Sequence, residues 1–105
     1  LTRTTFKSGL VAGVPETVVV AHKFGYRAVE QGAPEEELHD CGIIYYPDHP
    51  YLLCIMTRGK TIVDLAKVIQ NISRATYQER NAEFKHWFSL VLPWEALLRP
   101  SEALA

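Results

Sequence analysis

Residues 17–24 read TVVVAHKF, and Gly25 follows directly. The run is rich in β-branched residues and stays apolar on both faces until His22 and Lys23. Such a run predicts a β-strand that is covered on both faces, because valine and threonine favour the extended backbone and a solvated face would alternate with polar residues. Gly25 is expected to end this strand. The other elements are placed relative to it.

Two further apolar runs follow, at residues 39–46 and 51–57. The connection between them, residues 47–50, reads PDHP, and its two prolines are expected to end both strands. We therefore predict an antiparallel hairpin in which Tyr46 lies opposite Tyr51.

The stretches before and after the first strand are less regular. Residues 4–14 predict the end of a helix or a compact turn, with Gly9 and Gly13 as breaks in the pattern. Residues 26–38 are polar and include three consecutive glutamates at 35–37. This acidic run is expected to be a solvated loop.

A helix is predicted after the hairpin, over residues 61–78. Thr61 and Asp64 have the spacing of a capping box at its start. Apolar residues recur on one face at helical spacing, and those expected to be buried against the sheet are Leu65, Ile69 and Ile72. The predicted fold class is therefore α+β, a three-stranded antiparallel sheet with a C-terminal helix packed on it.

The last part of the chain, residues 80–105, is predicted to be an amphipathic tail that is also helical, after a sheet-and-helix portion at residues 1–79. Its apolar residues at helical spacing include Phe84, Trp87, Phe88 and Val91. We expect the tail to pack on the domain. The alternative is an exposed stretch that meets a partner or a membrane surface, and its mixed charge disfavours the membrane.

The composition limits the classes of protein to consider. With 105 residues, 48% hydrophobic and 22% charged, the chain has the size and composition of one globular domain, which excludes wholesale disorder. Its 11 basic and 12 acidic residues give a net charge of −1, so no nucleic-acid partner is expected. No apolar run approaches the ~20 residues of a membrane span. The first residue is Leu1 rather than methionine, which is compatible with a sequence that is part of a longer polypeptide.

The two cysteines are expected to be buried thiols, because each lies in an apolar run. In the predicted register Cys41 faces Met56 and Cys54 faces Ile43, so the cysteines are diagonal neighbours, a long separation for a disulfide. Two thiols are compatible with a reducing and with an oxidising compartment, so the sequence leaves the compartment undecided. His39 shares their face, but the three residues lack the paired spacing of zinc ligands, so no metal site is predicted.

Lys23 is the residue whose position points to chemistry. It ends an apolar strand, where a half-buried ammonium costs free energy unless it meets a carboxylate or a bound anion. Gly25 would allow a ligand to approach the backbone there. Two interpretations remain open: the strand end holds an anionic, acylated substrate, or Lys23 extends its ammonium into solvent.

The order of these elements resembles the C-terminal portion of the class A β-lactamase and penicillin-binding-protein superfamily. Residues 15–25 are similar to its K-T-G strand, and residues 39–47 to the following strand, which carries an Asp before an apolar run. Residues 50–59 match the next strand, and residues 61–78 match the C-terminal helix. The resemblance covers residues 4–77.

This resemblance implies serine acyl transfer on β-lactam, peptide or ester carbonyls, without a cofactor. It assigns substrate binding to residues 23–26. Lys23 would supply positive potential for a substrate carboxylate, Gly25 would allow close approach, and the Tyr26 N–H would donate to the oxyanion. Phe24 stands where the family has threonine.

The catalytic motifs of that family are absent from the sequence. There is no S-D-N or Y-x-N motif, and no serine is followed three residues later by lysine, the serines being Ser8, Ser73, Ser89 and Ser101. We therefore expect the C-terminal portion of a β-lactamase-like serine hydrolase, without a catalytic residue of its own and inactive alone.

The resemblance also suggests partners and a location. The expected partner is the missing N-terminal helical half of the fold, and the exposed edge of the strand at residues 51–57 predicts self-association. The family implies export to the periplasm or cell surface. The alternative function is a non-catalytic interaction module that binds through its sheet edge and its Trp-containing tail.

Overall fold

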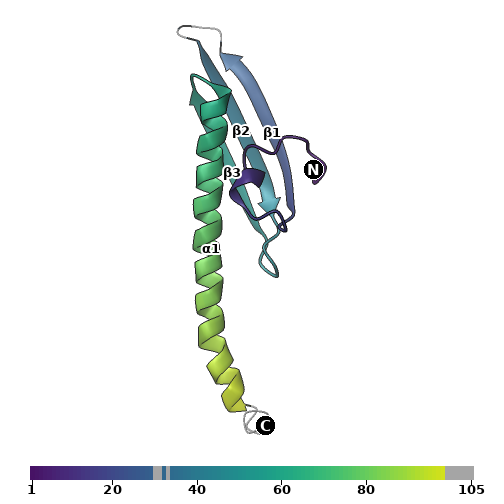
Figure 1. Cartoon of the computed structure of the whole chain (residues 1–105), viewed down its shortest axis with the longest axis vertical. Coiled ribbons are helices and arrows are strands. Elements are labelled where there is room, and N and C mark those ends of the chain that lie inside the picture. The colour runs from purple at the N-terminus through teal and green to yellow at the C-terminus, as the bar shows by residue number, and fades with distance from the viewer. Residues whose placement is uncertain (30–31, 33, 99–105) are drawn as a thin grey trace.

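The computed structural model describes residues 1–29, 32 and 34–98, and the side chains of these residues as far as His86. The elements in chain order are η1 (Val11–Gly13), β1 (Val20–Val29), β2 (Glu35–Ile44), β3 (Tyr51–Gly59) and α1 (Ile62–Leu98). The strands form one antiparallel sheet in the order β1-β2-β3, and α1 lies along it (Figure 1). The predicted α+β fold class is confirmed.

The bounds of β1 and β2 correct the prediction of an acidic loop. β1 continues past Gly25 as far as Val29, and β2 begins at Glu35, so that residues 35–37 are in a strand. The glutamates are paired across the sheet: Glu37 lies 3.1 Å from Arg27, and Glu35 forms an ion pair with Arg58 on β3. Cross-strand charge pairs make a strand out of a run whose polarity alone predicts a loop.

The hairpin forms, but its register differs from the prediction by two residues. Ile44, rather than Tyr46, lies opposite Tyr51. Tyr46 leaves the sheet and donates a hydrogen bond from its hydroxyl to Asn81 Oδ1 on α1, at 2.8 Å. A shift of two residues keeps every side chain on its predicted face but changes which residues are opposite.

The prediction of two buried thiols is wrong. Cys41 lies directly opposite Cys54 in the observed register, and the two form a disulfide with a Cα–Cα distance of 4.0 Å. Both residues are exposed. The physical reason is the register: residues directly opposite on antiparallel strands are close enough for a bond that the diagonal positions would not allow.

The helix begins as predicted and extends further. The Asp64 N–H donates to Thr61 Oγ1 at 3.3 Å, which is the capping contact expected from the sequence. α1 then continues past Gln78 without a break as far as Leu98. Contacts from the hairpin loop support this extension, including His49, which stacks on Phe84 with 4.1 Å between ring centroids.

None of the helical segments that the structure describes combines the length and the hydropathy of a membrane span.

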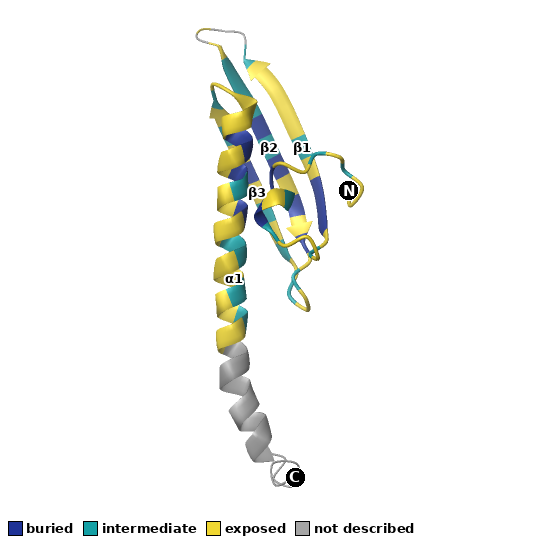
Figure 2. Cartoon of the chain, in the orientation of Figure 1, coloured by how far each residue is buried: buried dark blue, intermediate teal, exposed yellow. Residues whose placement is uncertain are grey.

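The core lies between the sheet and α1. Leu65 and Ile69 are buried as predicted, but Ile72 is 42% exposed. The buried stripe continues through Ser73 instead, because Gly13 of the N-terminal segment packs there: a Cβ on Gly13 would lie 2.6 Å from Ser73 Cβ. Figure 2 shows α1 buried only along the side that faces the sheet. The core consists of Leu10, Val20, Leu38, Ile44, Ile55, Leu65, Ala66 and Ile69.

Candidate functional site

Lys23 and Gly25 lie on the face of the sheet opposite α1, which we call the outer face. Successive side chains of a strand point to opposite faces, and the core residue Val20 of β1 fixes which face is which. Lys23 and Gly25 are both exposed. A Cβ on Gly25 would meet no atom within 4 Å. Packing among the described residues therefore gives no reason for glycine at this position, and there is room for a ligand.

The Lys23 ammonium extends along the strand rather than into the core. Its Nζ donates to the Phe24 carbonyl oxygen at 3.5 Å and lies 5.6 Å from the centroid of the Phe24 ring. The ion pairs formed among the described residues do not include Lys23. Its positive charge is therefore not neutralised by an ion pair within the described part of the chain.

The backbone pairing determines where the Tyr26 N–H points. The Tyr45 N–H donates to the Val19 oxygen at 2.9 Å, so the odd-numbered residues of β1 form the hydrogen-bonded pairs with β2. Even-numbered residues then direct their N–H groups to the other edge of β1. His22 shows this, since its N–H donates to the Leu1 oxygen at 3.4 Å. By the same alternation the Tyr26 N–H points away from β2, at the outer edge of the sheet.

The side chains of Phe24 and Tyr26 lie on the face opposite to Lys23. Phe24 is half-buried and packs on Phe6, with 4.7 Å between ring centroids. The Tyr26 hydroxyl donates to Glu36 Oε1 at 3.1 Å. This hydrogen bond is the main reason why the pKa of Tyr26 is raised above its ordinary value of 10.0. The structure thus divides the four predicted site residues between two faces.

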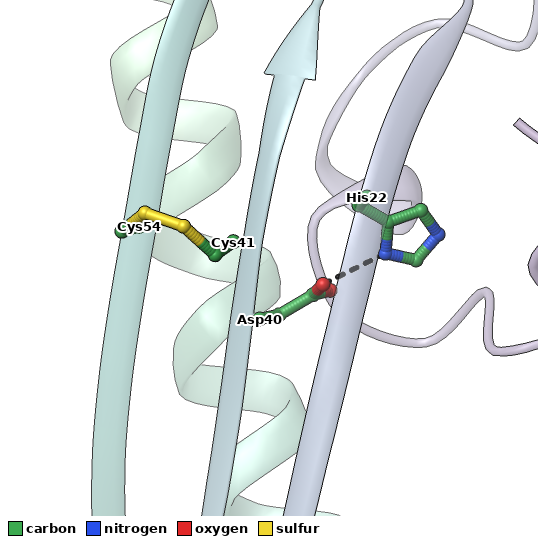
Figure 3. Close-up of a disulfide and its surroundings, with 4 residues drawn as sticks. All are labelled: His22, Asp40, Cys41 and Cys54. Atoms are coloured by element: carbon green, nitrogen blue, oxygen red, sulfur yellow. Dashed lines mark hydrogen bonds and ion pairs between the residues drawn. A yellow bond between two sulfur atoms is a disulfide. The ribbon is translucent and has the colours of Figure 1, made fainter. Parts of the chain in front are cut away.

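A buried pair beside Lys23 was not predicted from the sequence. His22 Nδ1 and Asp40 Oδ1 lie 2.7 Å apart, and the two side chains are 1% and 0% exposed (Figure 3). The other carboxylate oxygen of Asp40 accepts a hydrogen bond from the Leu10 N–H at 3.0 Å. Asp40 therefore ties β1 and the N-terminal segment to β2, next to the residues that carry the candidate site.

Gly42 is the sequence signal that could have indicated this pair. It lies opposite His22, and a Cβ on Gly42 would be 2.5 Å from His22 Cβ. A glycine two residues after a buried aspartate makes room for the side chain on the neighbouring strand. The residue is conspicuous in an apolar strand, but the sequence alone does not say which side chain fills the space.

His39 shares the outer face with the disulfide. Its Nδ1 accepts a hydrogen bond from the Thr57 N–H at 3.3 Å. The sulfurs of Cys41 and Cys54 are bonded to each other. In the described part of the chain, no group of three or more His, Cys, Asp or Glu residues could hold a metal ion.

Comparison with known proteins identifies a family and a similar fold. The sequence matches the beta-lactamase enzyme family over residues 1–80. The fold is similar to the solved structure of PBP-A, with a TM-score of 0.57 and 24% sequence identity, over 77% of this chain. The match spans only 29% of the PBP-A chain. No protein of the curated collection matches.

Proposed function

Because this chain belongs to the beta-lactamase enzyme family, we propose that it supplies the substrate-binding strand of a serine hydrolase that acts on β-lactam, peptide or ester carbonyls. The observation that carries the proposal is the arrangement at β1. An exposed lysine without an ion pair among the described residues and an unobstructed glycine lie on one face, beside a strand edge to which the Tyr26 N–H points.

Three residues of β1 have a role in this proposal. Lys23 attracts the carboxylate of an anionic substrate, because no carboxylate of the described residues forms an ion pair with it. Gly25 leaves space for the substrate to lie against the strand. The Tyr26 N–H donates to the carbonyl oxygen as negative charge develops on it during acyl transfer. The phenyl ring of Phe24 packs inward and takes no part.

The nucleophile comes from outside this chain. An attacking serine needs an adjacent base, and no serine of the sequence has the S-x-x-K spacing. Ser73 is fully buried, and its hydroxyl donates to the Leu10 oxygen at 2.8 Å. The remaining parts of the fold would belong to a helical half that is the partner of this chain. Disulfides persist in oxidising compartments, so Cys41–Cys54 supports an exported protein.

The test begins with the coding region upstream of Leu1. We expect it to encode an S-x-x-K serine, and the joined polypeptide should be acylated by a labelled penicillin. Lys23→Gln should lower the second-order acylation rate about tenfold, the cost of losing one charged contact. Lys67→Gln, on an exposed lysine of α1, is the matched control and should leave the rate unchanged. An upstream region without S-x-x-K, or equal rates for the two variants, would contradict the proposal.

A second candidate is a non-catalytic interaction module, and one observation favours it. Leu52 and Met56 of β3 are 70% and 77% exposed on the outer face, beside the strand's unpaired edge in the described sheet. Such edges recruit other chains. Sedimentation across a wide dilution range should then show self-association that a Leu52→Lys substitution abolishes. A monomer at every concentration would reject this candidate.

A further inference from the structure

Lys23 differs from the arginines of the sheet in what holds its side chain. Arg27 of β1 lies 3.1 Å from Glu37, and Arg58 of β3 is likewise paired with a glutamate. The Lys23 ammonium instead donates to the Phe24 carbonyl oxygen at 3.5 Å and lies 5.6 Å from the centroid of the Phe24 ring. Among the described residues, a backbone oxygen and an aromatic ring thus hold this cation in place of a carboxylate.

We propose that Phe24 is a positioning residue of the substrate-binding strand. It holds the Lys23 ammonium at the edge of β1 that faces away from β2, and it leaves the positive charge available to a substrate carboxylate. The ring takes no part in contacting the substrate and acts only through Lys23. This inference rests on the proposed function, which supplies the carboxylate.

The backbone pairing determines the edge at which the ammonium lies. The odd-numbered residues of β1 form the hydrogen-bonded pairs with β2, so the carbonyl groups of the even-numbered residues point to the other edge. The Phe24 oxygen that accepts the Lys23 hydrogen bond therefore points away from β2. The Tyr26 N–H points to the same edge, so this edge carries both the cation and the oxyanion donor of the proposed function.

The Phe24 ring is itself held by its neighbours. It is half-buried, packs against the hydrophobic core, and contacts the ring of Phe6 with 4.7 Å between centroids. Because this packing already orders the ring, only the lysine side chain loses rotamer freedom when the contact with the ammonium forms. Phe24 is therefore a fixed point against which a flexible lysine can be placed.

An aromatic ring and a carboxylate differ in their effect on a lysine. A carboxylate neutralises the ammonium in an ion pair, which then attracts a substrate anion only weakly. An aromatic ring attracts the ammonium through its quadrupole and has no net charge. The field of the Lys23 charge therefore persists at the strand edge. The threonine that the family has at position 24 lacks such a ring, so this contact distinguishes the chain from the family pattern.

NMR spectra of the chain itself test whether the ring holds the ammonium. Protons over the face of an aromatic ring resonate upfield, so the methylene protons beside the Lys23 ammonium should be shifted upfield. Phe24→Tyr keeps a ring and should keep the shift, whereas Phe24→Leu should abolish it. Phe6→Leu is the matched control and should keep the shift, because it removes the stacking partner but leaves the Phe24 ring beside Lys23. An unshifted lysine in the unmodified chain, or a shift that survives Phe24→Leu, would overturn the proposal.

The acylation rate of the joined polypeptide tests whether Phe24 acts through Lys23. Phe24→Leu should lower the second-order rate with labelled penicillin about twofold to fivefold, the size expected from an exposed cation–π contact. Phe24→Tyr and Phe6→Leu should keep the rate. In a Lys23→Gln background, Phe24→Leu should have no further effect. The same loss in both backgrounds, or equal rates for the Leu and Tyr variants of Phe24, would overturn the positioning role.

Failure of the proposed function gives a different pattern of results. An unmodified joined polypeptide that is not acylated would contradict the hydrolase function. The upfield shift of Lys23 and its loss in Phe24→Leu would still be expected, because they depend only on contacts within this chain.

Discussion

Asp40 Oδ1 lies 2.7 Å from His22 Nδ1, and the pair is almost completely shielded from solvent. The same carboxylate accepts a hydrogen bond from the Leu10 N–H. Three segments that are distant in sequence thus meet at one buried carboxylate. His22 is the residue before Lys23, so this contact positions the strand that carries the candidate site.

Removal of the Asp40 carboxylate should destabilise the fold. Asp40→Ala leaves the His22 ring and the Leu10 N–H without their buried partner, and breaking such contacts costs about 3 kcal/mol. Urea denaturation measures the loss. Glu16→Ala, on an exposed acidic residue, is the control and should change stability by less than about 0.5 kcal/mol. A similar small change for Asp40→Ala would show that the pair does not hold the segments together.

Gly13 and Gly25 should differ in their response to substitution by alanine. A Cβ on Gly13 would lie 2.6 Å from the Gln70 oxygen and from Ser73 Cβ on α1, so Gly13→Ala should cost about 1–3 kcal/mol by overpacking. Gly25→Ala meets no atom within 4 Å and should leave the unfolding free energy nearly unchanged. Thermal denaturation of the two variants checks this. Equal losses would mean that the N-terminal segment does not pack on α1 as described.

The inward face of α1 is tested by truncation of its apolar side chains. Leu65 is buried, and Leu65→Ala should cost roughly 2–5 kcal/mol. Ile72 is 42% exposed, so Ile72→Ala should cost about 1 kcal/mol or less. Chemical denaturation of both variants gives the comparison. A larger loss at Ile72 would indicate that the helix is rotated relative to the sheet.

Tyr51 should make the fold sensitive to alkaline pH. Burial is the main cause that raises the pKa of Tyr51 above 10.0, with a further contribution from Tyr77. A raised pKa means that the fold favours the neutral phenol. The contribution of the neutral phenol to stability is therefore present at lower pH and is lost as the pH rises through 10 and above. In the described structure the Tyr51 hydroxyl is buried without a hydrogen-bond partner.

Substitution of Tyr51 by phenylalanine separates the cost of the buried, unsatisfied hydroxyl from the effect of its ionisation at high pH. Tyr51→Phe should be at least as stable as the original chain at neutral pH, because it removes an unsatisfied buried hydroxyl. Its stability should also decline less steeply above about pH 10. Urea denaturation at several pH values measures both. Tyr45→Phe, on an exposed tyrosine, is the control, and an equal alkaline decline in both variants would contradict the assignment to Tyr51.

The order of the elements could be predicted because each has a local signal. β-branched runs indicate strands, the prolines at 47 and 50 separate two of them, and Thr61 caps the helix. The faces of the strands followed from the alternation of side chains, which is insensitive to a shift of two residues. For this reason the sequence correctly predicts a shared face for the two cysteines but not their direct pairing.

The features that could not be predicted depend on contacts between distant residues. The register of the hairpin depends on Tyr46 and Asn81, which are far apart in sequence. The strand character of residues 35–37 depends on arginines of the two neighbouring strands. The His22–Asp40 pair depends on space left by Gly42. None of these relationships has a local sequence pattern, because each joins residues that are brought together only by the fold.

We propose that this chain carries a substrate-binding strand but not the nucleophile. Intact-mass spectrometry of the 105-residue chain after incubation with a labelled penicillin tests it most directly. We predict the unmodified mass, because a serine hydroxyl without an adjacent base is a poor nucleophile. A stable acyl adduct on any of the four serines would contradict the claim.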